Sequence, residues 1–148
     1  MRVVLQRVSR AAVTVEDRTV GEIGPGVLLL VGVGQDEREH QIQRLAEKIY
    51  HLRIFEDGSG KMNLALLDAG GSILLIPQFT LYADWRRGRR PSWARAAPPE
   101  IAARHVEALG RALESLGATV ARGAFGEHME VDIVNDGPVT LVLDTADL

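Results

Sequence analysis

The sequence predicts one mixed α/β domain in which two helices lie on one side of a β-sheet. Strand-like stretches occupy most of residues 1–33, apolar residues spaced three and four apart predict two later helices, and strands return near the end. A length of 148 residues, with 46% hydrophobic and 25% charged residues, fits one globular domain that covers residues 1–148.

The first part of the chain has the pattern of four short strands. They are "RVVLQRV", "AAVTVE", "RTVGEIG" and "GVLLLVGV", at residues 2–8, 11–16, 18–24 and 26–33. Short polar segments separate them, and "GPG" marks the last turn. The pattern "VGVGQ" at 31–35 lacks the helix-opening glycine of a dinucleotide-binding loop, so we interpret it as the end of a strand.

Two amphipathic helices are predicted at 37–53 and 98–116. Asp36 and Glu39 form a capping-box pattern before the first helix, whereas "PPE" opens the second and Gly117 ends it. The remaining stretches predict strands, and the first of these is interrupted by a proline. They are "SILLIPQFTLYA" at 72–83, "ATVARGA" at 118–124, "MEVDIV" at 129–134 and "VTLVLD" at 139–144.

The composition excludes several classes of function. The chain has no cysteine, which removes disulfides, thiolate metal sites and cysteine nucleophiles. No apolar run is long enough to span a membrane, and the N-terminal stretch is too short for a signal peptide, so we expect a cytoplasmic protein. The four histidines show no metal-ligand spacing, so we assign them no role, and the mechanism implied by the family resemblance described below requires neither a metal nor a cofactor.

The basic residues are concentrated in "WRRGRRPSWAR", residues 85–95, although the net charge of the chain is -3. This segment has five arginines and no acid, and it contains both tryptophans, Trp85 and Trp93. Guanidinium groups suit phosphate oxygens and indoles suit base stacking, so RNA contact is one interpretation. A solvated loop is the other. The candidate contacts are Arg86, Arg87, Arg89 and Arg90.

Just before this loop, "PQFTLY" places an amide, an aromatic ring and a hydroxyl in succession at Gln78, Phe79 and Thr80. Pro77 marks a strand edge, because proline cannot donate to a ladder. One interpretation is an ordinary strand with Phe79 and Leu81 packed inward. The other is a polar shelf that opens toward the arginines.

Near the end of the chain, Gly137 and Pro138 precede the last predicted strand. They form either a turn that starts this strand or a cis peptide bond that turns two carbonyl oxygens into a site. The residues alone leave both alternatives open.

The stretches "LQRVSRAAVTVEDRTVGEIGPGVLLLVGV", "GKMNLAL", "PQFTLYAD", "GRRPSW" and "GAFGEHMEVDIVNDGPVTLVLDT" together resemble the D-aminoacyl-tRNA deacylases, also called D-tyrosyl-tRNA deacylases. The resemblance implies a homodimer with three layers, formed by two β-sheets and helices. It implies hydrolysis of the ester between a D-amino acid and tRNA, a chiral proofreading activity of translation quality control that rejects L-aminoacyl esters. It also makes glycyl-tRNA a candidate substrate.

Carried over residue by residue, Gln78, Phe79 and Thr80 resemble the first motif of the family, which forms the adenosine and reaction pocket. Gly137 and Pro138 resemble its second motif, a Gly-cisPro pair that enters the active site of the partner protomer. Arg7 matches an arginine thought to hold that pair. On this interpretation, the pair is a backbone wall that an L side chain would strike.

Two mechanisms follow from the resemblance. In the first, the Thr80 hydroxyl attacks the ester carbonyl, although no base stands beside it in the sequence. In the second, the ribose 2′-hydroxyl assists the attack of water, and backbone N–H groups near Phe79 and Thr80 stabilise the oxyanion. We favour the second. Pro77 departs from the usual serine and matches a sister branch with looser chiral selection, but Phe79, which that branch lacks, assigns the main branch. The competing functions are a noncatalytic RNA-binding module and a general esterase that uses Thr80.

Overall fold

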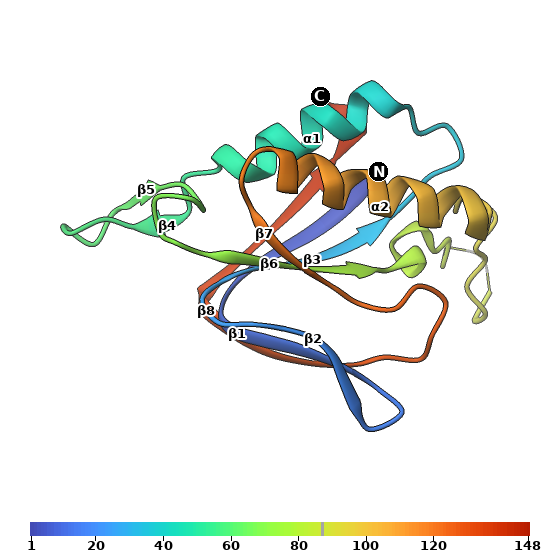
Figure 1. The fold of residues 1–148 in the computed structure, drawn as a ribbon. Coiled ribbons are helices and arrows are strands. Elements are labelled where there is room, and N and C mark those ends of the chain that lie inside the picture. The colour runs from blue at the N-terminus through green and yellow to red at the C-terminus, as the bar shows by residue number, and fades with distance from the viewer. Residues whose placement is uncertain (87) are drawn as a thin grey trace.

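The core of the molecule is a six-stranded sheet with two helices on one face (Figure 1). We describe residues 1–86 and 88–148 of a computed structural model. The strand order is β2-β1-β3-β6-β7, with β8 paired to β1. The strands are β1 (Arg2–Val15), β2 (Arg18–Ile23), β3 (Gly26–Gly32), β6 (Ser72–Pro77), β7 (Thr119–Arg122) and β8 (Glu130–Asp144).

The other elements frame this sheet. Helices α1 (Glu39–His51) and α2 (Pro99–Ser115) pack side by side on it. Strands β4 (Phe55–Glu56) and β5 (Met62–Leu64) form a separate ribbon that projects from one end (Figure 1). Two short 3₁₀ helices, η1 (Phe79–Tyr82) and η2 (Thr145–Asp147), follow β6 and β8.

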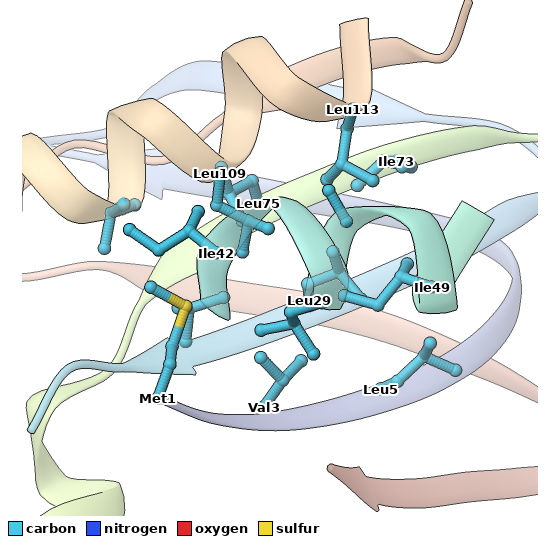
Figure 2. Close-up of a cluster of buried hydrophobic side chains, with 14 of the residues drawn as sticks. Met1, Val3, Leu5, Leu29, Ile42, Ile49, Ile73, Leu75, Leu109 and Leu113 are labelled. Atoms are coloured by element: carbon cyan, nitrogen blue, oxygen red, sulfur yellow. The ribbon is translucent and has the colours of Figure 1, made fainter. Parts of the chain in front are cut away.

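The structure has a six-stranded sheet, a two-stranded sheet and two helices, and the six-stranded sheet contains both halves of β1. Strand β1 pairs with β3 through its first half and with β2 through its second half, so the hydrogen-bonded ladder is continuous. Residues of β3 and β6 alternate between two cores. Leu29 and Leu75 pack under the helices (Figure 2), whereas Leu28 and Leu74 pack against the second half of β1.

Both faces of β3 and β6 are therefore covered. Parallel strands buried on two faces are expected to be apolar throughout, which explains the uninterrupted runs in this part of the sequence. The mixed α/β architecture predicted from the sequence is confirmed.

Two predictions about strand boundaries were wrong. The strands expected at 2–8 and 11–16 are one strand, β1, and those expected at 129–134 and 139–144 are one strand, β8. The two long strands stay paired because shifts in their register absorb the irregular residues. Gly137 and Pro138 consequently lie inside β8 rather than at the start of a strand.

The two helices occur where the periodicity predicts them. The first begins two residues later than expected, and Asp36 does not cap it; the Arg38 N–H instead donates to the side chain of Gln41 at 3.2 Å. The second ends before Gly117, whose φ of 104° is a conformation that favours glycine. In the described residues, no helix is long and apolar enough to cross a membrane.

The second core gives a testable stability difference between two leucines. Leu74 is fully buried between the strand layers, whereas Leu67 is 60% exposed. We expect Leu74→Ala to lower the free energy of unfolding by about 2–5 kcal/mol, because it leaves a cavity. Leu67→Ala should change it by less than about 0.5 kcal/mol. Urea denaturation of the two variants measures both values, and equal losses would contradict the layered core.

Candidate functional site

The stretch after β6 is a single turn of 3₁₀ helix, so the strand predicted over 72–83 ends at Pro77. The Gln78 N–H donates to the Val31 carbonyl at 2.7 Å, which is the last bond to β3. The Leu81 N–H then turns back to the Gln78 carbonyl at 3.2 Å. The inward packing of Phe79 expected for a strand is also wrong, because its side chain is 55% exposed.

Two glycines at the end of β3 explain this turn. A Cβ on Gly32 would lie 3.0 Å from the Gln78 carbonyl oxygen, and one on Gly34 would lie 2.9 Å from the ring of Tyr82. Helix η1 therefore rests directly on the glycine backbone. The pattern "VGVGQ" is a strand end, as predicted, but the sequence did not predict that η1 packs against its two glycines.

The side chains of Gln78 and Thr80 contact each other. The Gln78 amide nitrogen donates to the Thr80 hydroxyl oxygen. Across residues 1–86 and 88–148, no carboxylate or imidazole hydrogen-bonds to Thr80, so its hydroxyl has no base to activate it. The backbone N–H groups of Phe79 and Thr80 have no backbone acceptor in the same part of the chain. They are donors available to a ligand.

Arg2 fixes the far end of η1. Its guanidinium donates to the Leu81 carbonyl at 3.2 Å and to Asp144 at 2.8 Å, and it lies 4.8 Å from the centre of the Tyr82 ring. The hydrogen bond to Asp144 raises the pKa of Arg2. Burial alone would raise the pKa of Asp144, but hydrogen bonds from Arg2 and Ala146 and nearby positive charge hold it below its usual value.

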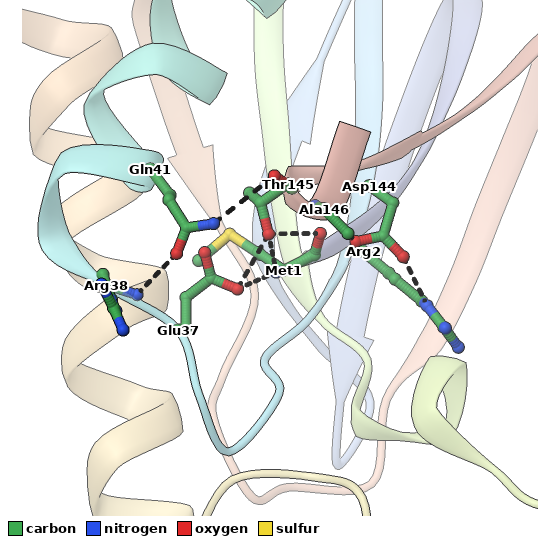
Figure 3. A network of polar contacts seen from close by, with 8 residues as sticks. All are labelled: Met1, Arg2, Glu37, Arg38, Gln41, Asp144, Thr145 and Ala146. Atoms are coloured by element: carbon green, nitrogen blue, oxygen red, sulfur yellow. Dashed lines mark hydrogen bonds and ion pairs between the residues drawn. The ribbon is translucent and has the colours of Figure 1, made fainter. Parts of the chain in front are cut away.

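A polar network extends from this clamp to α1 (Figure 3). The Met1 amino group contacts Glu37 and Thr145, and burial lowers the pKa of that amino group to about 6. The network lines a hollow of about 340 Å³ beside Tyr82. Sequence reasoning missed Arg2, Glu37 and Thr145, because they come from separate segments and no local pattern joins them.

The arginine-rich loop begins directly beside η1. Asp84 and Ser92 exchange two backbone hydrogen bonds, at 2.8 and 2.9 Å, and close the base of the loop. The rings of Phe79 and Trp93 meet edge to face, with their centres 5.2 Å apart. The predicted polar shelf and the basic loop are thus adjacent.

The arginines of this loop are mostly free of acidic partners. Arg86 is exposed and lies 3.6 Å from the carboxylate of Asp84. Arg89 and Arg90 are exposed and form no ion pair with any residue that the structure describes. The fourth predicted contact, Arg87, lies outside the described residues.

The Gly137-Pro138 peptide bond is cis, and both residues are exposed in a bulge of β8. Between the pairs Gln6–Thr140 and Val8–Asn135, β1 has one residue, Arg7, and β8 has the bulged residues 136–139 opposite it. Asn135 closes the bulge, because its side chain accepts from the Val139 N–H at 2.9 Å and donates to the Val139 carbonyl at 3.3 Å. This closing role of Asn135 was also not foreseen.

Arg7 lies behind the bulge and is only 4% exposed. Its guanidinium donates to the Asp136 carbonyl at 3.1 Å and to the Ile54 carbonyl at 2.6 Å. The carboxylates of Asp136 and Glu56 lie 3.3 and 3.8 Å away. Hydrogen bonds from a charged donor are strong, so Arg7 ties the bulge to the segment that follows α1.

The two candidate motifs are not brought together within one chain. Arg7, opposite the bulge, shares its row of the sheet with Val27 and Ile73, whereas Pro77 shares a row with Val31 at the other end of β3. Gln78 lies five residues further along β6 than the row of Arg7, and three strand spacings separate β6 from β8. Together these offsets put Gln78 roughly 20 Å from the bulge.

The histidines form no metal centre. In the described part of the chain, no group of three histidine, aspartate or glutamate side chains comes close enough to hold a metal ion. His105 is half-buried in α2, where desolvation lowers its pKa. That the protein works without a metal stays a prediction, which hydrolysis in the presence of a chelator would test.

Comparison with known proteins shows to which family the chain is related. The family model described as D-Tyr-tRNA(Tyr) deacylase matches residues 4–144. A D-aminoacyl-tRNA deacylase from Roseiflexus castenholzii is 57% identical over 99% of this chain and 93% of its own length. One from Thermomicrobium roseum is 57% identical over the whole chain and 96% of its own length.

Solved structures agree with these sequence matches. The structure of a protein named c-Myc DNA Unwinding Element Binding Protein has a TM-score of 0.91 and 35% identity, covering 97% of this chain and 98% of the other. A probable eukaryotic D-amino acid tRNA deacylase has a TM-score of 0.80 at 18% identity, covering 96% and 97%, and shares the fold. The chain belongs to the D-Tyr-tRNA(Tyr) deacylase family.

The glycine seat under η1 is tested by adding one methyl group. We expect Gly34→Ala to lower the melting temperature by several degrees and to change the near-ultraviolet circular dichroism of Tyr82, because the new Cβ overlaps its ring. Gly58→Ala is the matched control, since a Cβ there meets nothing within 4 Å. Identical spectra and melting curves for both variants would contradict this packing.

Proposed function

We propose that this protein hydrolyses the ester bond of D-aminoacyl-tRNA and releases a free D-amino acid and tRNA. The observation that carries the proposal is membership of the deacylase family over residues 4–144. We further propose that the whole chain, residues 1–148, acts as one deacylase domain and works in the cytoplasm.

The proposed active site needs two protomers. Gln78, Phe79 and Thr80 would come from one protomer, and Gly137 and Pro138 from its partner. The separation of the two motifs within one chain supports this arrangement, as does the exposure of the bulge. Among the described residues, strand β8 pairs only with β1, and Val142 on it is 74% exposed. An edge strand with exposed apolar residues is suited to association with a second copy.

The bulge would select the D enantiomer by excluding the other. Its backbone carbonyls would form a wall near the α-carbon of the substrate, and an L side chain would collide with it. The buried Arg7 would hold this wall through the Asp136 carbonyl. Glycine has no side chain to collide, so we expect glycyl-tRNA to be a second substrate.

The geometry favours hydrolysis by water over a threonine nucleophile. The Thr80 hydroxyl already accepts a hydrogen bond from the Gln78 amide, and an amide is no base. In the proposed step, the oxygen of water bonds to the ester carbonyl carbon with help from the ribose 2′-hydroxyl. The bond from that carbon to the ribose 3′ oxygen then breaks, and this oxygen takes up a proton. The free N–H groups of Phe79 and Thr80 would stabilise the oxyanion.

The remaining residues would complete the pocket. Pro77 is half-buried at the end of β6 and offers neither a hydroxyl nor an N–H, so it would shape the pocket without donating to the substrate. Arg86, Arg87, Arg89 and Arg90 would contact tRNA phosphates.

The proposed activity is tested by following the loss of three esters in the presence of a chelator. We expect D-tyrosyl-tRNA and glycyl-tRNA to be hydrolysed and L-tyrosyl-tRNA to persist. Inhibition by the chelator would contradict the predicted independence from metals. Loss of both tyrosyl esters would contradict the proposed chiral wall. No loss of any ester, together with tRNA binding, would favour a noncatalytic module, a possibility raised by the name of one similar protein, which describes DNA binding.

The shared active site is tested by mixing two inactive variants. Phe79→Ala removes the proposed pocket of one chain, and Gly137→Ala disturbs the bulge, because a Cβ there would lie 2.7 Å from Val139 in a conformation of φ 133°. Each variant alone should be inactive. After mixing and exchange of subunits, about a quarter of wild-type activity should return, since each mixed dimer has one intact site.

The control for this experiment is Gly24→Ala, which adds a methyl group in open space and should leave activity unchanged. Light scattering should show that all variants are dimers. If the mixture of Phe79→Ala and Gly137→Ala stays inactive although mixed dimers form, the bulge does not act in the partner's site.

A further inference from the structure

Exposed aromatic residues lie in and beside the candidate site. Phe79 in η1 is in edge-to-face contact with Trp93, and Trp85 stands at the other side of the loop base. Trp93 is 41% exposed and Trp85 is 73% exposed. Indoles with so much free surface do not serve the core of this fold, and clustered exposed aromatics typically mark a binding surface.

The base of the loop fixes the backbone next to both tryptophans. Trp85 and Trp93 each directly follow one member of the hydrogen-bonded pair Asp84 and Ser92. The segment after Trp93 is tied to the end of β3, because the Gln35 side chain donates to the Ala94 carbonyl at 2.6 Å. The backbone next to Trp93 is therefore joined to the segment that follows β3, close to the glycines on which η1 rests.

The charges around these aromatic residues favour a polyanion. Arg86, Arg89 and Arg90 are exposed on the same loop, and residues 85–95 include no acidic residue. Asp84 is the carboxylate nearest to Arg86, at 3.6 Å. Stacking rings beside guanidinium groups are the combination that binds single-stranded nucleic acid, because every base offers a flat face and every nucleotide adds a phosphate.

We infer that Trp93 and Trp85 form a stacking platform for the unpaired nucleotides that precede the terminal adenosine of tRNA. This inference rests on the proposed function, which places the adenosine at Phe79. Because Trp93 touches Phe79, the next base toward the 5′ side is the one that it reaches first. The arginines then neutralise the phosphates of the same short strand.

Fluorescence tests the platform without requiring catalysis. Both tryptophans of the chain lie in this loop, so emission excited selectively in tryptophan, without its two tyrosines, reports on the platform alone. We expect the trinucleotide CCA to quench it saturably, and Trp85→Phe and Trp93→Phe to show which indole responds. No quenching by CCA would overturn the inference, as would quenching only by vesicles of anionic lipid, which would assign the surface to a membrane.

Kinetics tests whether the platform serves the reaction. Trp93→Ala should raise KM for D-tyrosyl-tRNA about tenfold, the expected loss of one stacked base, and raise KM for D-tyrosyl-adenosine by a much smaller factor. Trp85→Ala should act in the same direction, and Trp93→Phe should restore most of the affinity. Phe125→Ala is the control, because Phe125 is an exposed aromatic residue outside this loop.

The two proposals fail in different ways. If the wild-type protein hydrolyses neither substrate, the proposed function fails, and the fluorescence titration still decides whether the loop binds CCA. If the wild-type protein is active and Trp93→Ala and Trp85→Ala, shown by melting curves to be folded, keep the wild-type KM for D-tyrosyl-tRNA, the platform is excluded while the deacylase proposal stands.

Discussion

The antiparallel pairing of β1 with β8 is the constraint on which both candidate motifs depend. At the outer end of this ladder, Arg2 and Asp144 are partners, and Arg2 holds the last turn of η1. Further along, the ladder opens around Arg7, whose guanidinium holds the bulge. One run of backbone hydrogen bonds therefore positions both η1 and the bulge that contains Gly137 and Pro138. Side chains of both strands, among them Leu5 and Leu141, pack in the core under the helices.

Much of the fold was predictable because it follows from periodicity. The two helices have apolar residues on one face, and the strands of the buried sheet are apolar throughout, so local sequence reports their burial directly. Strand boundaries were less predictable. Ser9 and Arg10 have the pattern of a break, yet β1 continues through them because its partner β8 supplies the hydrogen bonds. A single segment carries no record of such a partner.

The candidate site was predictable where its residues are neighbours in the sequence. Gln78, Phe79 and Thr80 stand out as a group, but their helical turn depends on Gly32 and Gly34, about fifty residues earlier. In the same way, Arg7 and Asn135 both stabilise the bulge, and they come next to it only because β1 pairs with β8. The cis state of Gly137-Pro138 could not be read from the residues, since the sequence alone leaves both forms of an X-Pro bond open.

The placement of Arg2 and Arg7 on one strand has a consequence for how this protein can change over evolution. Side chains alternate between the faces of a strand, so inserting or deleting one residue between these two arginines would send one of them to the wrong face. Replacing an intervening apolar residue by another of similar size would leave both in place. In this stretch, the spacing of residues is thus under tighter constraint than their identity, and divergence should proceed by substitution at constant length.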